Sequence, residues 1–266
     1  MMSDTTHYVS YWENAPGQTM PAYVALALVS MRRALGDRFL LLTPRTVSEH
    51  IDADIMNKAW AFEPLSFTLA NGIEAIVAKS DFIRMAFVHR WGGAWLDADT
   101  LLFRDPSVEL FPTGLSHKLH WHSECIFASL PGNPILAQAL AIGLESENHA
   151  WGNPGRIKNI IAQAAQAADA AIPIGGEVID PGYRPLYNFA GCEVMRRTDI
   201  AVGAFLINDV AILKLYNTYF RRTEARRETV AEFLAGGSLL AKLFLHIEAN
   251  ADYWVDESDK LIASVA

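Results

Sequence analysis

The sequence has few cysteines, no excess of basic residues and no long hydrophobic run, and each of these features excludes a class of protein. Its two cysteines, Cys125 and Cys192, do not make a disulfide framework or a cysteine-based zinc site. Lysine and arginine number 22 against 30 aspartate and glutamate residues, a formal net charge of −8 that argues against nucleic acid as the main partner.

Membrane-spanning and secreted proteins are also disfavoured. The longest early apolar run, residues 22–31, is too short to cross a bilayer, and the first residues lack the basic and apolar regions of a signal peptide. We therefore expect a cytoplasmic protein. A peripheral contact with the inner membrane stays open, because a surface helix could supply it.

Alternating strand and helix patterns predict the α/β fold class. Apolar strand patterns lie at residues 7–12, 38–43, 94–96 and 121–129. Helical patterns lie at residues 21–35, 46–50, 73–88, 134–144, 157–171, 210–220 and 229–246. This order predicts a parallel or mixed sheet with helices on its faces. We expect one domain over residues 1–266, with a nucleotide-binding half at about 1–140 and a helix-rich acceptor half at about 141–266.

A loop at residues 173–188 is rich in proline, glycine and tyrosine. It is long for a simple connector, and long loops in compact domains are often functional. We expect it either to close over donor or acceptor or to be a well-packed structural loop.

The strongest functional signal lies between Lys79 and Phe103. The helix predicted there is apolar on nearly every face, so it should be deeply packed. Asp81 and Arg84 sit inside it with i,i+3 spacing, and such charges are costly unless they are paired or turned towards a polar site. Glycine tolerates the positive φ of a helix C-terminus, so Gly92 and Gly93 should end the helix.

Two carboxylates follow the next strand. Asp97 and Asp99, at the end of this strand, share one face by the period of two. Two oxygen ligands at a strand end suit a hard divalent cation, Mg²⁺ or Mn²⁺, that also holds a phosphate.

The combination resembles the DXD-containing, sugar-binding glycosyltransferases. These include the capsular polysaccharide synthesis proteins, the yeast initiating mannosyltransferases and, more distantly, the clostridial glucosylating toxins. The matching residues are Ser80, Asp81, Arg84, Gly92, Gly93, Trp95, Asp97 and Asp99. Tyr11-Trp12-Glu13 is similar to the family's opening strand and turn, and the segment from His122 to Ala128 is similar to a strand lining the sugar pocket.

The resemblance implies an A-type glycosyltransferase fold, Rossmann-like in its nucleotide-sugar-binding part. It implies a UDP- or GDP-linked sugar donor, a divalent metal, and a glycan or lipid-linked saccharide acceptor in bacterial surface polysaccharide synthesis. Many relatives retain the anomeric configuration. No dedicated base is evident in the sequence, which agrees with front-face attack in a retaining enzyme.

Family roles carry over to individual positions. Trp12 would stack on the base, with Tyr11 as the alternative. Asp99 would bind the metal directly, and Asp97 would bind ribose or metal-bound water, so these two form the expected catalytic pair. The other expected donor-binding residues are Ser80, Asp81, Arg84, Gly93, Ser123 and Glu124.

Two other functions fit part of this pattern. The run from Leu96 to Leu101 satisfies the nucleophile motif of a haloacid-dehalogenase-type phosphatase, with Asp97 as nucleophile and Asp99 as acid/base. That fold also needs a downstream lysine and an acidic pair, and it gives the two glycines no role. A non-catalytic nucleotide-sugar-binding protein is the other alternative.

Overall fold

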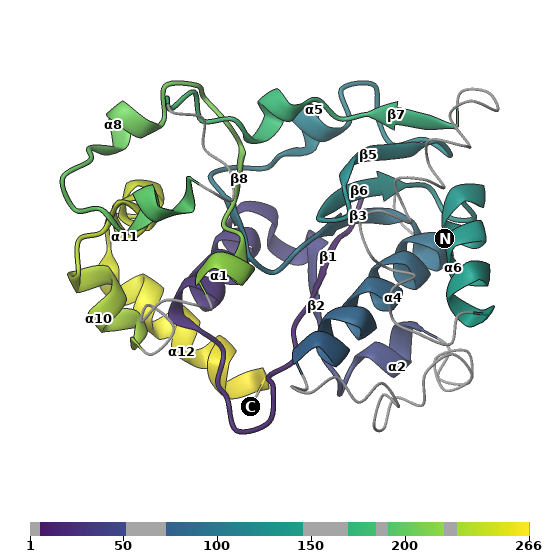
Figure 1. Cartoon of the computed structure of the whole chain (residues 1–266), viewed down its shortest axis with the longest axis horizontal. Helices are drawn as coiled ribbons and strands as arrows, with labels where there is room; N and C mark the ends of the chain where they lie inside the picture. The colour runs from purple at the N-terminus through teal and green to yellow at the C-terminus, as the bar shows by residue number, and fades with distance from the viewer. Residues whose placement is uncertain (1–5, 52–72, 146–169, 185–190, 221–227, 266) are drawn as a thin grey trace. The chain divides into compact units, whose positions relative to one another are not determined.

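The computed structural model describes residues 6–51, 73–145, 170–184, 191–220 and 228–265 (Figure 1). The chain divides into two compact units. Unit 1 comprises Met1–Gly17, Arg38–Asp97 and Phe111–Ile174, and unit 2 comprises Gln18–Asp37, Ala98–Leu110 and Gly175–Ala266. The units therefore alternate along the chain, whereas the division expected from the sequence follows chain order.

Unit 1 is built on a six-stranded sheet with the strand order β2-β1-β3-β6-β5-β7. The strands are β1 (Tyr8–Tyr11), β2 (Phe39–Leu42), β3 (Gly93–Leu96), β5 (Leu119–Ser123), β6 (Ile126–Ser129) and β7 (Ala171–Pro173). Strands β2 and β3 flank β1 in parallel, while β6 runs antiparallel to both β3 and β5. The sheet is mixed, and the predicted α/β class is confirmed.

Helix α4 (Ile73–Trp91) forms the centre of the unit 1 core. Its residues 82–88 are all buried, and it packs against β1, β3, β6 and α6 (Pro134–Glu145). Figure 1 shows α4 and α6 side by side. The prediction of a deeply packed helix is confirmed for residues 81–88, where the apolar faces are enclosed, whereas Val77 in the earlier part of the helix is 50% exposed. The short helix α2 (Val47–His50) adds Val47 to the same core.

The two glycines end α4 as predicted. The Gly92 N–H bonds to the Val88 carbonyl, and φ is +72° at Gly92 and +97° at Gly93. A Cβ at Gly93 would lie 2.5 Å from the carbonyl oxygen of His7, so glycine also permits the close approach of β3 to the residue preceding β1.

Unit 2 is organised around α1 (Ala22–Leu35), whose residues 22–31 are all buried. It packs against β4 (Thr100–Leu102), α10 (Val230–Ala235) and α12 (Ala251–Val265). Strand β4 pairs antiparallel with β8 (Ile212–Lys214). The remaining elements are α5 (Ser107–Leu110), η3 (Gly176–Ile179), η4 (Cys192–Arg196), α8 (Val202–Phe205), α9 (Asn217–Phe220) and α11 (Leu239–Ile247).

Three expectations about individual elements are wrong. Residues 121–129 are not one strand, because β5 and β6 form a hairpin that turns at Glu124 and Cys125. Residues 210–220 are not one helix but strand β8 followed by α9. Residues 229–246 hold two helices rather than one, separated at Gly236 and Gly237, where Ser238 caps α11.

Some expected features fall outside the described residues. They are residues 157–169 of the helix predicted over residues 157–171 and the end of the predicted loop, residues 185–188. Ala171, the last residue of that predicted helix, instead begins β7. Among the helices that the structure describes, none is both long and apolar enough to cross a membrane.

Candidate functional site

The carboxyl ends of β1, β2 and β3 define one edge of the unit 1 sheet. Strand β1 lies between β2 and β3, so the chain leaves β1 towards one side and later returns to the other. In open α/β sheets, ligands bind outside the carboxyl ends of strands at such a switch point. The residues that follow β1 and β3 are therefore the candidates for ligand contact.

Four segments bring polar side chains to this edge. Trp12 and Glu13 follow β1, and Asp97 follows β3. Because Leu96 pairs with Ile126, the β5–β6 turn that carries Glu124 lies at the same end of β3. The Asp97 N–H donates to the carbonyl of Cys125 in that turn at 3.0 Å.

Helix α4 supplies the fourth segment, for a geometric reason. The chain reverses at the two glycines, so the helix runs back past β3. From Arg84 to Trp91 the helix rises about 10 Å, and four residues of strand from Gly93 to Asp97 span about 13 Å. The middle of α4 therefore lies level with the end of β3.

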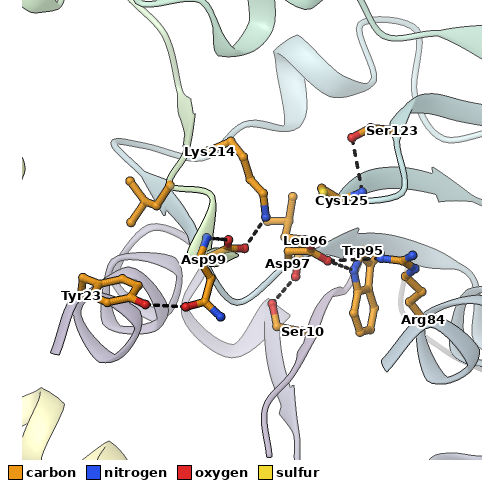
Figure 2. A network of polar contacts seen from close by, with 12 residues as sticks. Ser10, Tyr23, Arg84, Trp95, Leu96, Asp97, Asp99, Ser123, Cys125 and Lys214 are labelled. Atoms are coloured by element: carbon orange, nitrogen blue, oxygen red, sulfur yellow. Dashed lines mark hydrogen bonds and ion pairs between the residues drawn. The ribbon is translucent and has the colours of Figure 1, made fainter. Parts of the chain in front are cut away.

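Arg84 lies between two carboxylates of unit 1. Its Nη2 is 2.5 Å from Asp81 Oδ1, and its Nη1 is 3.7 Å from Asp97 Oδ1. The indole Nε1 of Trp95 donates to the same Asp97 oxygen at 2.8 Å. Figure 2 shows Arg84, Trp95 and Asp97 grouped at the end of β3, where the Ser10 hydroxyl also donates to the Leu96 carbonyl.

The charges in this cluster are buried and unequal. Asp81, Arg84 and Glu124 are each at most 8% exposed, and three carboxyl groups including Asp97 face one guanidinium. Burial raises the pKa of Asp81 to about 7; Arg84 opposes that rise, while Asp97 and Glu124 add to it. Burial lowers the pKa of Arg84, but the Asp81 and Asp97 carboxylates outweigh it and leave the pKa raised.

Glu124 has an unused hydrogen-bonding atom. Its Oε1 is buried and accepts no hydrogen bond from the residues that the structure describes. A buried carboxylate oxygen is costly to leave unsatisfied. The position is therefore suited to a ligand that brings hydroxyl or N–H donors.

The segment after β1 is held by a second ion pair. Lys79 Nζ lies 2.9 and 2.7 Å from the two carboxylate oxygens of Glu13. The Tyr11 hydroxyl also donates to Glu13, and burial together with the Glu13 charge raises the pKa of Tyr11. The Trp12 N–H bonds to the Leu42 carbonyl at 3.0 Å, so the segment is fixed on both sides.

The two aromatic residues proposed for base stacking differ in burial. Tyr11 is 4% exposed and belongs to the core cluster. Trp12 is half-buried, and its indole Nε1 donates to Asn14 at 2.8 Å. An exposed ring face is what stacking requires, so Trp12 meets the requirement better than Tyr11.

The other expected donor-binding residues lie at different places in unit 1. Ser80 is half-buried on α4, beside Asp81. The Ser123 hydroxyl bonds to the Cys125 N–H at 3.3 Å and lies 3.0 Å from His122 Nδ1, inside the β5–β6 turn. Gly93 begins β3, at the opposite end of that strand from Asp97, so the structure gives it a packing role.

Asp99 belongs to unit 2, and its side chain is occupied there. Strand β3 ends at Leu96 and residues 98–99 form a turn, so the period-two argument for a shared face does not apply. Lys214 donates to Asp99 Oδ1, and the Asn217 N–H donates to Oδ2 (Figure 2). Lys214 and Asp99 are 5% and 8% exposed.

The side chains as they lie do not fit the expected Mn²⁺ or Mg²⁺. A hard cation needs several oxygen ligands with free lone pairs. The ammonium of Lys214 already lies against Asp99, and Trp95 and Arg84 lie against Asp97. Within the described ranges, no three His, Cys, Asp or Glu side chains gather as a metal cluster.

Sequence reasoning missed Glu13 as a partner of Lys79 and missed Lys214 altogether. One signal was available for Lys214, since it is the single charge in the apolar run from Val210 to Leu215. A lone lysine in such a run has to be paired when the run is buried.

Comparison with known proteins adds little to this geometry. No protein family matches the sequence, and no curated protein matches it. Among solved structures, the chain is similar to one named PaToxG Glycosyltransferase, with 11% sequence identity and a TM-score of 0.45 over 61% of this chain and 70% of that chain. A likeness of this size carries no argument about function.

Proposed function

We propose that this chain is a glycosyltransferase that binds a nucleotide-sugar donor at the carboxyl edge of the unit 1 sheet. The observation that supports it most is Arg84, buried and held between Asp81 and Asp97 at the β1/β3 switch point. A buried arginine with carboxylates on both sides offers donors and acceptors at fixed positions. Sugar hydroxyl groups, which both donate and accept, match such a site.

The donor's parts would be recognised by different segments. The half-buried indole of Trp12 would stack on the nucleobase, and the Glu13–Lys79 pair would keep that segment in place. Asp97 would accept from the ribose. Arg84, Asp81 and Glu124 would hold the sugar, which supplies the donor that Glu124 Oε1 lacks within the described structure.

The transferred sugar would pass to a saccharide, either a glycan or a lipid-linked one. We expect retention of the anomeric configuration by front-face attack, for which the acceptor's own hydroxyl loses its proton to the departing phosphate. This step requires no base from the protein. Both the acceptor class and the stereochemistry come from the family resemblance alone.

The phosphatase alternative fits the structure less well. Asp97 would be its nucleophile, yet β3 is the third strand of the sheet and is flanked on one side by the antiparallel β6. Asp99 would have to act as the acid/base, but the ammonium of Lys214 neutralises it.

A donor panel tests the proposal. UDP- and GDP-linked hexoses are added singly to the purified chain, and both the thermal unfolding midpoint and the release of free nucleotide are measured. A bound donor at about 100 times its Kd stabilises by about 2.7 kcal/mol, which is easily detected. Arg84→Lys should abolish the shift, while Arg90→Ala, which removes an exposed arginine from the same helix, should leave it intact.

Each alternative has its own outcome in this experiment. Release of inorganic phosphate from p-nitrophenyl phosphate, with no donor shift, would identify a phosphatase. A donor shift without nucleotide release, in the presence of saccharide acceptors, would identify a binding protein. Only nucleotide release that depends on Arg84 agrees with the proposed function.

A further inference from the structure

The turn that begins β4 in unit 2 contains an ion pair that the proposed function does not use. Asp99 precedes Thr100, which is the register partner of Lys214 in the β4–β8 ladder. The pairing brings the two residues close together, and the Lys214 ammonium donates to Asp99 Oδ1. The Leu215 N–H also donates to the Asp99 carbonyl at 2.9 Å, so main chain and side chain are both engaged.

The turn after β8 completes the arrangement. Tyr216 has a φ of +53°, an uncommon conformation for a residue other than glycine, and the turn there brings the Asn217 N–H to Asp99 Oδ2. The Asn217 side chain in turn accepts from the Tyr23 hydroxyl on α1. Asp99 is thus held from β8, from the start of α9 and, through Asn217, from α1.

This arrangement competes with a metal at Asp99. An ammonium beside a carboxylate neutralises it and repels a divalent cation. Lys214 is only 5% exposed, so its ammonium cannot leave Asp99 without a rearrangement of the side chains that enclose it. A cation would have to displace Lys214 to reach Oδ1 and the Asn217 N–H to reach Oδ2.

We propose that Lys214 is the built-in counter-cation of Asp99 and takes the place that the Asp-x-Asp pattern assigns to a divalent cation. Asp99 then fastens β4 to the turn between β8 and α9 and binds no Mn²⁺ or Mg²⁺. The consequence that sugar transfer needs no cation at Asp99 rests on the proposed function. The ion pair itself does not, and it is tested without any measurement of activity.

Direct counting of bound Mn²⁺ by electron paramagnetic resonance decides whether Asp99 pairs with Lys214 or binds a divalent cation. We expect equal Mn²⁺ binding by the wild type, by Asp99→Asn and by the double variant Asp99→Asn/Lys214→Met. The double variant removes both buried charges together, so it keeps the test open if the single variant does not fold. A Mn²⁺ site present in the wild type and lost from the variants would overturn the proposal.

Thermal unfolding tests whether Lys214 and Asp99 stabilise each other. Lys214→Met should lower the midpoint by several degrees because Asp99 is left buried beside no ammonium, and adding Asp99→Asn should recover part of the loss. Lys260→Met is the matched control, since Lys260 pairs with Glu257 on the exposed face of α12 and should change little. Strictly additive losses from Lys214→Met and Asp99→Asn would overturn the pairing, whatever the donor panel shows.

Discussion

Arg84 Nη2 lies 2.5 Å from Asp81 Oδ1, one helical turn earlier on α4, and both side chains are almost completely buried. An i,i+3 pair on a helix surface contributes only a few tenths of a kcal/mol. In a buried position, removing one partner of the pair costs far more, because the other charge is then left uncompensated.

Single and double substitutions should therefore separate stability from function. Arg84→Ala should lower the free energy of unfolding by about 3–5 kcal/mol. The double variant Asp81→Asn/Arg84→Met should regain part of that stability, since both charges are gone, but it should not regain donor binding. Urea unfolding and a donor titration measure the two effects. If the double variant also binds donor normally, the pair is purely structural.

The raised pKa of Asp81 predicts a pH dependence of stability. Burial, opposed by Arg84 and aided by Asp97 and Glu124, raises the pKa from 3.8 to about 7, so the folded chain binds an extra proton between these values. The contribution of Asp81 to stability is complete below about pH 4 and is lost as the pH rises through 7, with a size on the order of 4 kcal/mol.

Asp81→Asn should accordingly flatten the stability profile between pH 4 and pH 8. The comparison is with Glu49→Gln, which removes an exposed carboxylate from the same unit and should leave the profile unchanged. Urea unfolding at several pH values supplies the curves. A wild-type profile that already runs parallel to that of Asp81→Asn would mean that Asp81 is ionised throughout.

The strands and helices of unit 1 up to the end of β3 were predictable because their signals are local. Apolar runs of strand length, a helix apolar on all faces and the glycine pair each specify a short segment without reference to the rest of the chain. The β5–β6 hairpin was not predicted because its turn at Glu124 and Cys125 contains none of the residues that are typical of turns. Strand β8, within residues 210–220, was predicted as helix because a short apolar run does not distinguish strand from helix.

In the candidate site, too, some residues could be predicted from the sequence and others could not. Asp81, Arg84 and Asp97 were identified because fixed spacing on one helix and the following strand brings them together. The Lys79–Glu13 pair joins residues 66 positions apart, and the Lys214–Asp99 pair joins residues 115 positions apart. No local periodicity reports such contacts, because they depend on which strands become neighbours in the sheets.

Trp12 should determine nucleotide affinity. Stacking of a base on an aromatic side chain contributes about 1–3 kcal/mol, so Trp12→Ala should raise the Kd for the donor by about 5- to 150-fold. Trp12→Phe should retain most of the affinity. Trp91→Phe is the control. Trp91 is the last residue of α4 and donates to the His50 carbonyl, so this substitution should change stability but not donor affinity. Equal donor affinities across the three variants would remove Trp12 from the site.

Gly93 offers a test of how β3 is placed. Its φ is +97°, and a Cβ would lie 2.5 Å from the backbone oxygen of His7, where no side-chain rotation can relieve the clash. Gly114 in the same unit has a φ of +84° with nothing within 4 Å of a Cβ, so Gly114→Ala measures the cost of the backbone conformation alone, about 1–2 kcal/mol. Gly93→Ala should cost clearly more, because it also forces β1 and β3 apart. Since these two strands carry Trp12 and Asp97, it should weaken donor binding as well. Urea unfolding of the two variants supplies the comparison, and equal losses would show that the contact with His7 is easily relaxed.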